Sequence, residues 1–137
     1  KMFAYLQVPQ MITEFVIGAD LGPLPFLLMA SGVILAIGFF FSSIVELIVV
    51  LPLFVAPAVY LGIDPVFYGI IAIMACNIGE ITPPMGPLLW MAVPICQERI
   101  GNIMREAWPF LGAMVLALLV TIFIPDIAMY LVNLWRV

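Results

Sequence analysis

Long apolar runs alternate along the chain with short polar or proline-rich interruptions. Between residues 21 and 63 the only charged side chain is Glu46, between 65 and 97 the only one is Glu80, and residues 107–125 have none. Each run is long enough to cross the hydrocarbon core of a membrane, which takes about 20 helical residues. The pattern therefore predicts an all-α polytopic membrane protein.

Residues 1–20 differ from the rest because they mix apolar side chains with Lys1, Glu14 and Asp20. Such a mixture predicts a helix that lies along the membrane interface rather than across the bilayer. Pro9 falls in the middle of this stretch and is expected to bend the helix.

The second part, residues 21–63, has two apolar arms separated by Ser42 and Ser43. One interpretation is a re-entrant hairpin that dips into the membrane, with its tip formed by Gly38 and the two serines. The other is a pair of ordinary spans with a slightly polar point between them. The residues alone leave both interpretations open.

The third part comprises residues 64–137. Gly62, just before it, is typical of a helix end, and Asp64-Pro65 is typical of a helix start. An apolar stretch follows, interrupted by "NIGEITPPMGPLLW" at residues 77–90. The apolar stretch and its interruption together cover about 30 residues, which is too long for one straight membrane span and too short for two. The pattern predicts one broken transmembrane helix with an unwound centre.

A polar stretch, residues 97–106, separates this broken helix from the last full span, Trp108 to Ile124. It contains Arg99 and Arg105, and the preference of positive charge for the cytoplasmic side would place it in the cytoplasm. The loop around Gly62 would then lie on the opposite side.

Glycine and proline are so dense around residue 82 that a continuous helix is implausible there. The residues concerned are Gly79, Pro83, Pro84, Gly86 and Pro87. In lipid, freed backbone groups cost several kcal/mol unless something satisfies them. Secondary transporters use such breaks to bind a small cation through carbonyl oxygens and an anion at a helix N-terminus.

Thr82 favours a binding site over a kink that only aids packing. Its hydroxyl adds a hard oxygen ligand beside the freed carbonyls, and hard cations prefer oxygen ligands. The kink remains the alternative interpretation of the prolines.

Glu46 and Glu80 are carboxylates at membrane depth, where facing lipid would cost about 2.5 kcal/mol or more. Both are therefore expected to face protein or a water-filled cavity. A proton relay or a cation ligand is one hypothesis, and a solvated cavity wall or a pairing with a polar group on a missing partner segment is the other. The two hypotheses have equal weight for Glu80, and the second hypothesis is preferred for Glu46.

Several functional classes are disfavoured by composition. The chain has no histidine, and its serines and threonines have no base beside them, so we expect no enzyme. Cys76 and Cys96 lie in apolar runs and are expected to be small core residues. The net charge is −4 and the four cations are scattered, so nothing indicates nucleic-acid binding.

The order "GFFFSS…LPLF…LGIDP…NIGEITPPMGP…REAWPFLGAMVLALLVTIFIPDIAMYL" resembles the C-terminal half of the large membrane subunit of TRAP transporters, within the ion transporter superfamily. The resemblance implies an elevator-type secondary transporter that imports organic acids such as C4-dicarboxylates or sialic acid across the bacterial inner membrane. It implies coupling to a sodium gradient. The implied partners are a small membrane subunit, a periplasmic substrate-binding protein and the N-terminal half of the large subunit, so the chain is expected to be one half of a transporter.

Site residues follow from the resemblance by position. A sodium site would form between the hairpin tip and the helix break, at Gly38, Ser42, Ser43, Gly79, Thr82 and Pro83. The organic acid would bind nearby, at Thr82, Pro84, Gly86 and Glu80. Two alternatives stay open: a transporter of the same superfamily that carries dicarboxylates without a binding protein, and a membrane scaffold that transports nothing.

Overall fold

The computed structural model describes residues 8–82 and 86–135, and these residues form helices joined by short turns, with no strand. The helices are α2 (Val8–Gly18), α3 (Pro23–Gly38), α4 (Ser43–Tyr60), α5 (Pro65–Ile81), α6 (Pro87–Cys96), α7 (Ile100–Phe123) and α8 (Pro125–Trp135). The prediction of an all-α chain is thus confirmed for this part of it. By length and composition, α4 and α7 can each cross a membrane.

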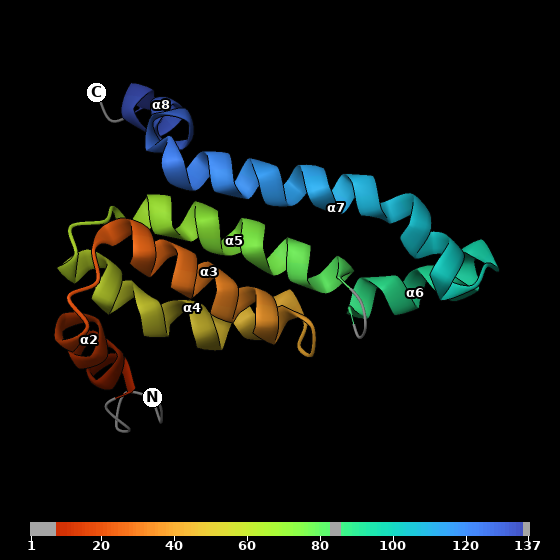
Figure 1. Cartoon of the computed structure of the whole chain (residues 1–137), viewed down its shortest axis with the longest axis horizontal. Coiled ribbons are helices and arrows are strands. Elements are labelled where there is room, and N and C mark those ends of the chain that lie inside the picture. Colours follow the sequence, from red (N-terminus) through yellow and green to blue (C-terminus); the bar gives the residue numbers. More distant parts are fainter. Residues whose placement is uncertain (1–7, 83–85, 136–137) are drawn as a thin grey trace.

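Helix α5 lies at the centre of the fold. It contacts α3, α4, α6, α7 and α8, and its most extensive pairing is with α3. Figure 1 shows α3, α4 and α5 running side by side, with α7 along the other side of α5 and α6 beyond its end. Helix α2 packs against α4 at the end remote from the turn that joins α3 to α4.

Small residues allow these helices to approach closely. Ala30 on α3 and Ala72 and Ala75 on α5 are almost completely buried. Membrane helices pack through such residues, because lipid tails give no hydrophobic drive and backbone proximity must supply the van der Waals contact. Larger side chains fill the remaining space; the rings of Phe26 on α3 and Phe54 on α4 have centroids 6.4 Å apart.

The closest approach of α3 and α5 occurs between two glycines. A Cβ atom added to Gly79 would lie 3.0 Å from Gly38 Cα and 3.2 Å from the carbonyl oxygen of Leu35. Because these neighbours are backbone atoms, they cannot turn aside as a flexible side chain would. A side chain at either glycine would push the two helices apart by a few tenths of an ångström.

The turn between α4 and α5 follows the predicted signals. Gly62 has a φ of +77°, which favours glycine, and the side chain of Asp64 accepts a hydrogen bond of 2.8 Å from the backbone N–H of Val66. Pro65 occupies the first helical turn of α5, where its missing N–H costs nothing. The predicted helix end and helix start are confirmed.

Three boundaries differ from the expectations. Pro9 is the second residue of α2 and lies in its first turn, where proline does not bend a helix, while residues 1–7 lie outside the described part. Helix α7 begins at Ile100, so most of the polar stretch 97–106 is helical; polar side chains that reach water do not end a helix. The chain forms a further helix after Pro125, which lacks the N–H needed to continue α7.

The two cysteines differ in burial. Cys76 is buried in α5 as expected, whereas Cys96 is exposed at the end of α6, so the expectation of a core residue was wrong there. Its apolar run ends at that residue, next to the turn that leads to α7.

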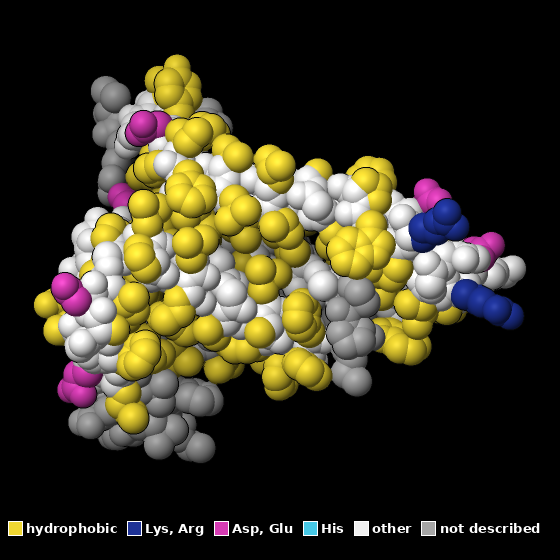
Figure 2. Space-filling model, viewed as in Figure 1, with side chains coloured by type: hydrophobic (Ala, Val, Ile, Leu, Met, Phe, Trp, Pro, Cys, Tyr) yellow, Lys and Arg dark blue, Asp and Glu magenta, His cyan; other side chains and the backbone are white. Residues whose placement is uncertain are grey.

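The surface is mostly apolar. Figure 2 shows hydrophobic side chains spread over the visible face; among the described residues, acidic side chains lie at its ends and basic ones at the α6–α7 end. Exposed aromatic residues such as Phe41, Trp90 and Phe110 contribute to this surface. An apolar band with charges at its ends is the distribution expected of a protein surrounded by lipid.

We expect Gly79→Ala to lower the free energy of unfolding by about 1 to 3 kcal/mol, because the added methyl group overpacks the glycine crossing. Gly69→Ala is the matched control, since Gly69 lies on the same helix and a Cβ there meets nothing within 4 Å. Thermal unfolding of the purified protein in detergent measures both. Equal stability of the two variants would contradict the close crossing.

Candidate functional site

The turn between α3 and α4 packs against the end of α5, and we call these residues, 38–43 and 79–82 together with Gly86, the tip–break junction. Gly38 ends α3, Ser42 is the N-cap of α4, and Thr82 is the C-cap of α5. The predicted hairpin tip and helix break therefore come together in space through Gly38 against Gly79 and Ser43 against Glu80, residues about 40 positions apart in the sequence.

Glu80 joins the two halves of the junction directly. Its Oε1 atom accepts a hydrogen bond of 2.5 Å from the backbone N–H of Ser43, and the residue is 8% exposed. The first N–H groups of a helix have no partner within it and form the positive end of its dipole. Ser42 makes no side-chain cap there, so the carboxylate of Glu80 supplies the cap from a different helix.

This contact shows which polar group Glu80 pairs with. The partner is the backbone at the start of α4, within this chain, rather than a side chain on another segment. It could not be recognised from the sequence, because the cap residue comes from 37 positions away.

Thr82 marks the point where the helix stops. Its backbone is extended, with φ −80° and ψ 132°, and its N–H donates to the carbonyl of Gly79 at 3.1 Å. The hydroxyl donates to the carbonyl of Ile78 at 2.6 Å. A hydroxyl that donates its proton keeps lone pairs on oxygen, so Thr82 Oγ1 can still bind a cation.

Gly79 and Glu80 remain helical, which corrects the expectation that Gly79 belongs to the unwound segment. A glycine in a helix normally weakens it, but here the absent side chain is what lets α3 approach. The non-helical backbone begins at Thr82.

Gly86 is the N-cap of α6 and lies directly against the end of α5. A Cβ there would overlap the carbonyl oxygen of Glu80 and lie 3.0 Å from that of Thr82. Glycine is therefore required for the second helix of the broken pair to start so close to the first. Pro83 and Pro84, predicted as site residues, lie outside the described residues.

Glu46 lies one turn beyond Ser43 on α4 and is 1% exposed. One of its carboxylate oxygens, Oε2, faces Gly38. It therefore borders the tip–break junction from within the helical core, facing protein as predicted.

Among the described residues no group of three or more His, Cys, Asp and Glu side chains gathers to hold a metal ion. Any cation at the junction would have to draw on hydroxyl and carbonyl oxygens besides the two carboxylates. That donor set suits a hard monovalent cation better than a transition metal.

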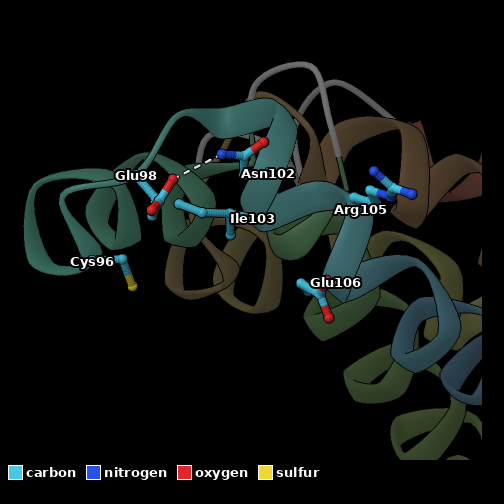
Figure 3. Close-up of a pocket in the computed structure, with 6 residues that line it drawn as sticks. All are labelled: Cys96, Glu98, Asn102, Ile103, Arg105 and Glu106. Atoms are coloured by element: carbon cyan, nitrogen blue, oxygen red, sulfur yellow. Dashed lines mark hydrogen bonds between the residues drawn. The ribbon is translucent and has the colours of Figure 1, made fainter.

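A separate cavity of about 640 Å³ lies at the turn between α6 and α7, and Figure 3 shows the six residues that line it. Glu98 accepts a 2.8 Å hydrogen bond from Asn102 there, and Arg105 and Glu106 extend from the first turns of α7. Cys96 and Ile103 complete the lining. Figure 1 places this turn at the far end of α6, away from the tip–break junction.

A helical hairpin whose tip packs on a broken apolar helix is typical of membrane transport proteins. The family model of the tripartite ATP-independent periplasmic transporter, DctM component, matches residues 1–127. The chain belongs to this family, the large permeases of TRAP transporters, and the resemblance noted in the sequence is confirmed.

Curated relatives agree with this assignment. The chain is 35% identical over 128 residues to the C4-dicarboxylate TRAP transporter large permease protein DctM of Vibrio cholerae, covering 93% of the chain and 28% of the relative. It is 30% identical to the sialic acid TRAP transporter large permease protein SiaM of the same organism, covering 94% and 30%. It is 29% identical to the ectoine/5-hydroxyectoine permease UehC of Ruegeria pomeroyi, covering 97% and 31%. The chain thus spans about three tenths of the length of these relatives.

We expect Glu80→Ala to lower the free energy of unfolding by about 1 kcal/mol, since it leaves the partly buried N–H of Ser43 without its acceptor. Glu80→Gln keeps an acceptor oxygen and should lose less. Hydrogen exchange of the Ser43 amide, together with thermal unfolding, measures the effect. Exposed Glu106→Ala is the control, and an unchanged Ser43 exchange rate in Glu80→Ala would show that the cap does not form.

We expect Gly86→Ala to displace the start of α6, because its methyl group cannot share space with the Glu80 carbonyl. The measurement is limited proteolysis combined with thermal unfolding, with a stability loss above about 1 kcal/mol. Gly101→Ala is the control, since a Cβ at Gly101 meets nothing within 4 Å. If the two variants behaved alike, Gly86 would not lie against α5.

Proposed function

We propose that this chain forms the C-terminal part of the transport unit of a sodium-coupled importer of small organic acids, of the C4-dicarboxylate or sialic-acid type. In this proposal it works as a multi-pass component of the bacterial inner membrane. Its partners are the N-terminal half of the large permease, a small membrane subunit and a periplasmic substrate-binding protein. Membership of the TRAP large permease family supports each of these assignments.

The observation on which the proposal rests is the tip–break junction. At this junction Glu80, in the last turn of α5, contacts the start of α4, Thr82 ends α5, and α6 begins after its N-cap Gly86. Carbonyl and hydroxyl oxygens at such a break suit sodium. The N-terminus of α6 has no side-chain cap, so its dipole favours a substrate carboxylate.

The geometry also supports a re-entrant hairpin over two ordinary spans. Helix α3 has 16 residues, about 24 Å of helix, which is shorter than the roughly 30 Å of hydrocarbon. The tip meets the last turn of α5, and α5 and the α6 that follows it are both apolar. A tip that packs there ends inside the membrane rather than at its far surface.

The names of the relatives support the substrate class. Those relatives are named for C4-dicarboxylate, sialic acid and ectoine or 5-hydroxyectoine. In this proposal the carboxylate of an organic acid is the part that the start of α6 recognises.

We expect Thr82→Val to weaken sodium-driven uptake in the complete transporter, with the sodium concentration for half-maximal uptake rising about 10-fold as one oxygen ligand is lost. Thr121→Val is a closely matched control, because Thr121 makes the same hydroxyl bond to the carbonyl four residues earlier, at 2.8 Å, on α7. Uptake of labelled dicarboxylate or sialic acid into proteoliposomes is the measurement.

Unchanged sodium dependence in Thr82→Val would favour a break that serves packing alone, as in a membrane scaffold. Uptake that persists without the periplasmic binding protein would overturn the tripartite assignment and indicate a transporter that works without one. Loss of uptake in both threonine variants would show a general effect on helix packing.

A further inference from the structure

Asn77 is a polar residue on an exposed side of α5. Its side chain is exposed, although Cys76 and Ile78, its neighbours in the sequence, are almost completely buried. Its amide nitrogen donates a hydrogen bond of 2.8 Å to the carbonyl oxygen of Ile73, one turn earlier. That bond uses one of the two N–H donors of an asparagine and neither lone pair of its amide oxygen. The side chain can therefore both donate and accept a further hydrogen bond.

The position of Asn77 along α5 makes this exposure costly. The residue lies shortly before Thr82, where the helix breaks, and its neighbours on the same side of the helix, Ile73 and Ile81, are apolar. Lipid tails offer no hydrogen-bond partner, so an amide that faced them would lose the bonds it makes in water. Polar side chains inside membrane segments accordingly face protein or a water-filled cavity. Something other than a lipid tail should cover Asn77.

A groove of about 280 Å³ between α5 and α7 lies beside this side chain. The two helices run side by side (Figure 1). The lining is apolar except for one amide, and consists of Met74, Asn77, Ile78, Ile81, Met114 and Ala117. Ala113 and Ala117 are exposed one turn apart on α7, so an approaching helix meets small side chains at these two positions. Membrane helices pack through small residues and through single polar side chains that bond across the interface, and the groove offers both.

The part of the permease outside this chain is the source of such a helix. The two Vibrio cholerae relatives are matched over 28% and 30% of their length, so about seven tenths of each has no counterpart in this chain. Helix α5 already packs against α3, α4 and α7, which leaves the side that carries Asn77 for a further element. With most of the polypeptide still to be placed around this chain, the groove fits a helix of the same permease.

We propose that the α5–α7 groove binds a transmembrane helix from the N-terminal part of the permease, and that this helix presents a hydroxyl or an amide to Asn77. The inference rests on the proposed function for the existence of that partner, and it deepens the proposal by locating the contact. Gly79, two positions along, points about 200° around the helix and faces α3. The hairpin and the partner helix therefore hold opposite sides of the end of α5.

Photo-crosslinking in membranes that contain the complete transporter identifies the occupant of the groove. A diazirine analogue of methionine is introduced at Met114 alone, and the adduct formed on irradiation is identified by mass spectrometry. A peptide from the N-terminal part of the permease is the expected adduct. Leu116 is the matched control, because it is 63% exposed on the other side of α7, and the same probe there should label phospholipid. A phospholipid adduct at Met114, a peptide from the small membrane subunit, or reaction with water alone would overturn the proposal.

Hydrogen exchange in the same complete transporter tests the bond to Asn77. Asn77→Leu removes the amide but keeps a side chain of similar size, and the backbone amides of α7 around Met114 should exchange about 3-fold faster as the packing loosens. Asn77→Gln retains an amide and should show a smaller increase. Asn102→Leu is the matched control, since Asn102 makes a bond of the same length, 2.8 Å, to the residue four positions earlier, at the α6–α7 turn.

Equal exchange in wild type and Asn77→Leu would overturn the polar contact. Neither measurement depends on uptake, so the two proposals can fail separately. A peptide adduct at Met114 in a permease whose uptake does not respond to sodium would support the groove assignment and overturn the proposed transport function. A phospholipid adduct at Met114 in a sodium-driven permease would do the reverse.

Discussion

The close crossing of α3 and α5 at Gly38 and Gly79 is the constraint on which the rest of the structure depends. Because neither residue has a side chain, the end of one helix can lie against the last turn of the other at backbone contact. That approach brings the turn after α3 to the break after α5. The Glu80 cap and the burial of Glu46 beside the crossing follow from it.

Two buried carboxylates at this junction differ in how their charge is compensated. Glu80 is buried but held by the N-terminal N–H group of α4, so its charge helps to hold the tip in place. Glu46 is buried more completely and has no such donor. The first carboxylate therefore contributes to the packing of the tip, whereas the second is buried with no hydrogen bond in the described part of the chain to offset its desolvation.

Local signals in the sequence were sufficient for part of this structure. Gly62, Asp64 and Pro65 mark the α4–α5 turn because helix ends and helix starts depend on neighbouring residues alone. The interruption at Thr82 was predictable for the same reason. The hydrogen-bond partner of Glu80 was not predictable, since it depends on how two helices that are distant in sequence pack together. Gly79 was assigned to the break because a glycine is equally typical of an unwound segment and of a close approach between helices. The start of α7 at Ile100 was missed because polar side chains do not by themselves end a helix that borders water.

The most direct measurement is a cryo-electron microscopy reconstruction of the complete transporter in sodium and again without it. In sodium the hairpin tip should pack on the end of α5, with Ser43 against Glu80 and non-protein density beside the Thr82 hydroxyl. Without sodium that density should be absent and the tip less firmly packed. A tip separated from α5 in both conditions, or no density beside Thr82 in sodium, would contradict this account.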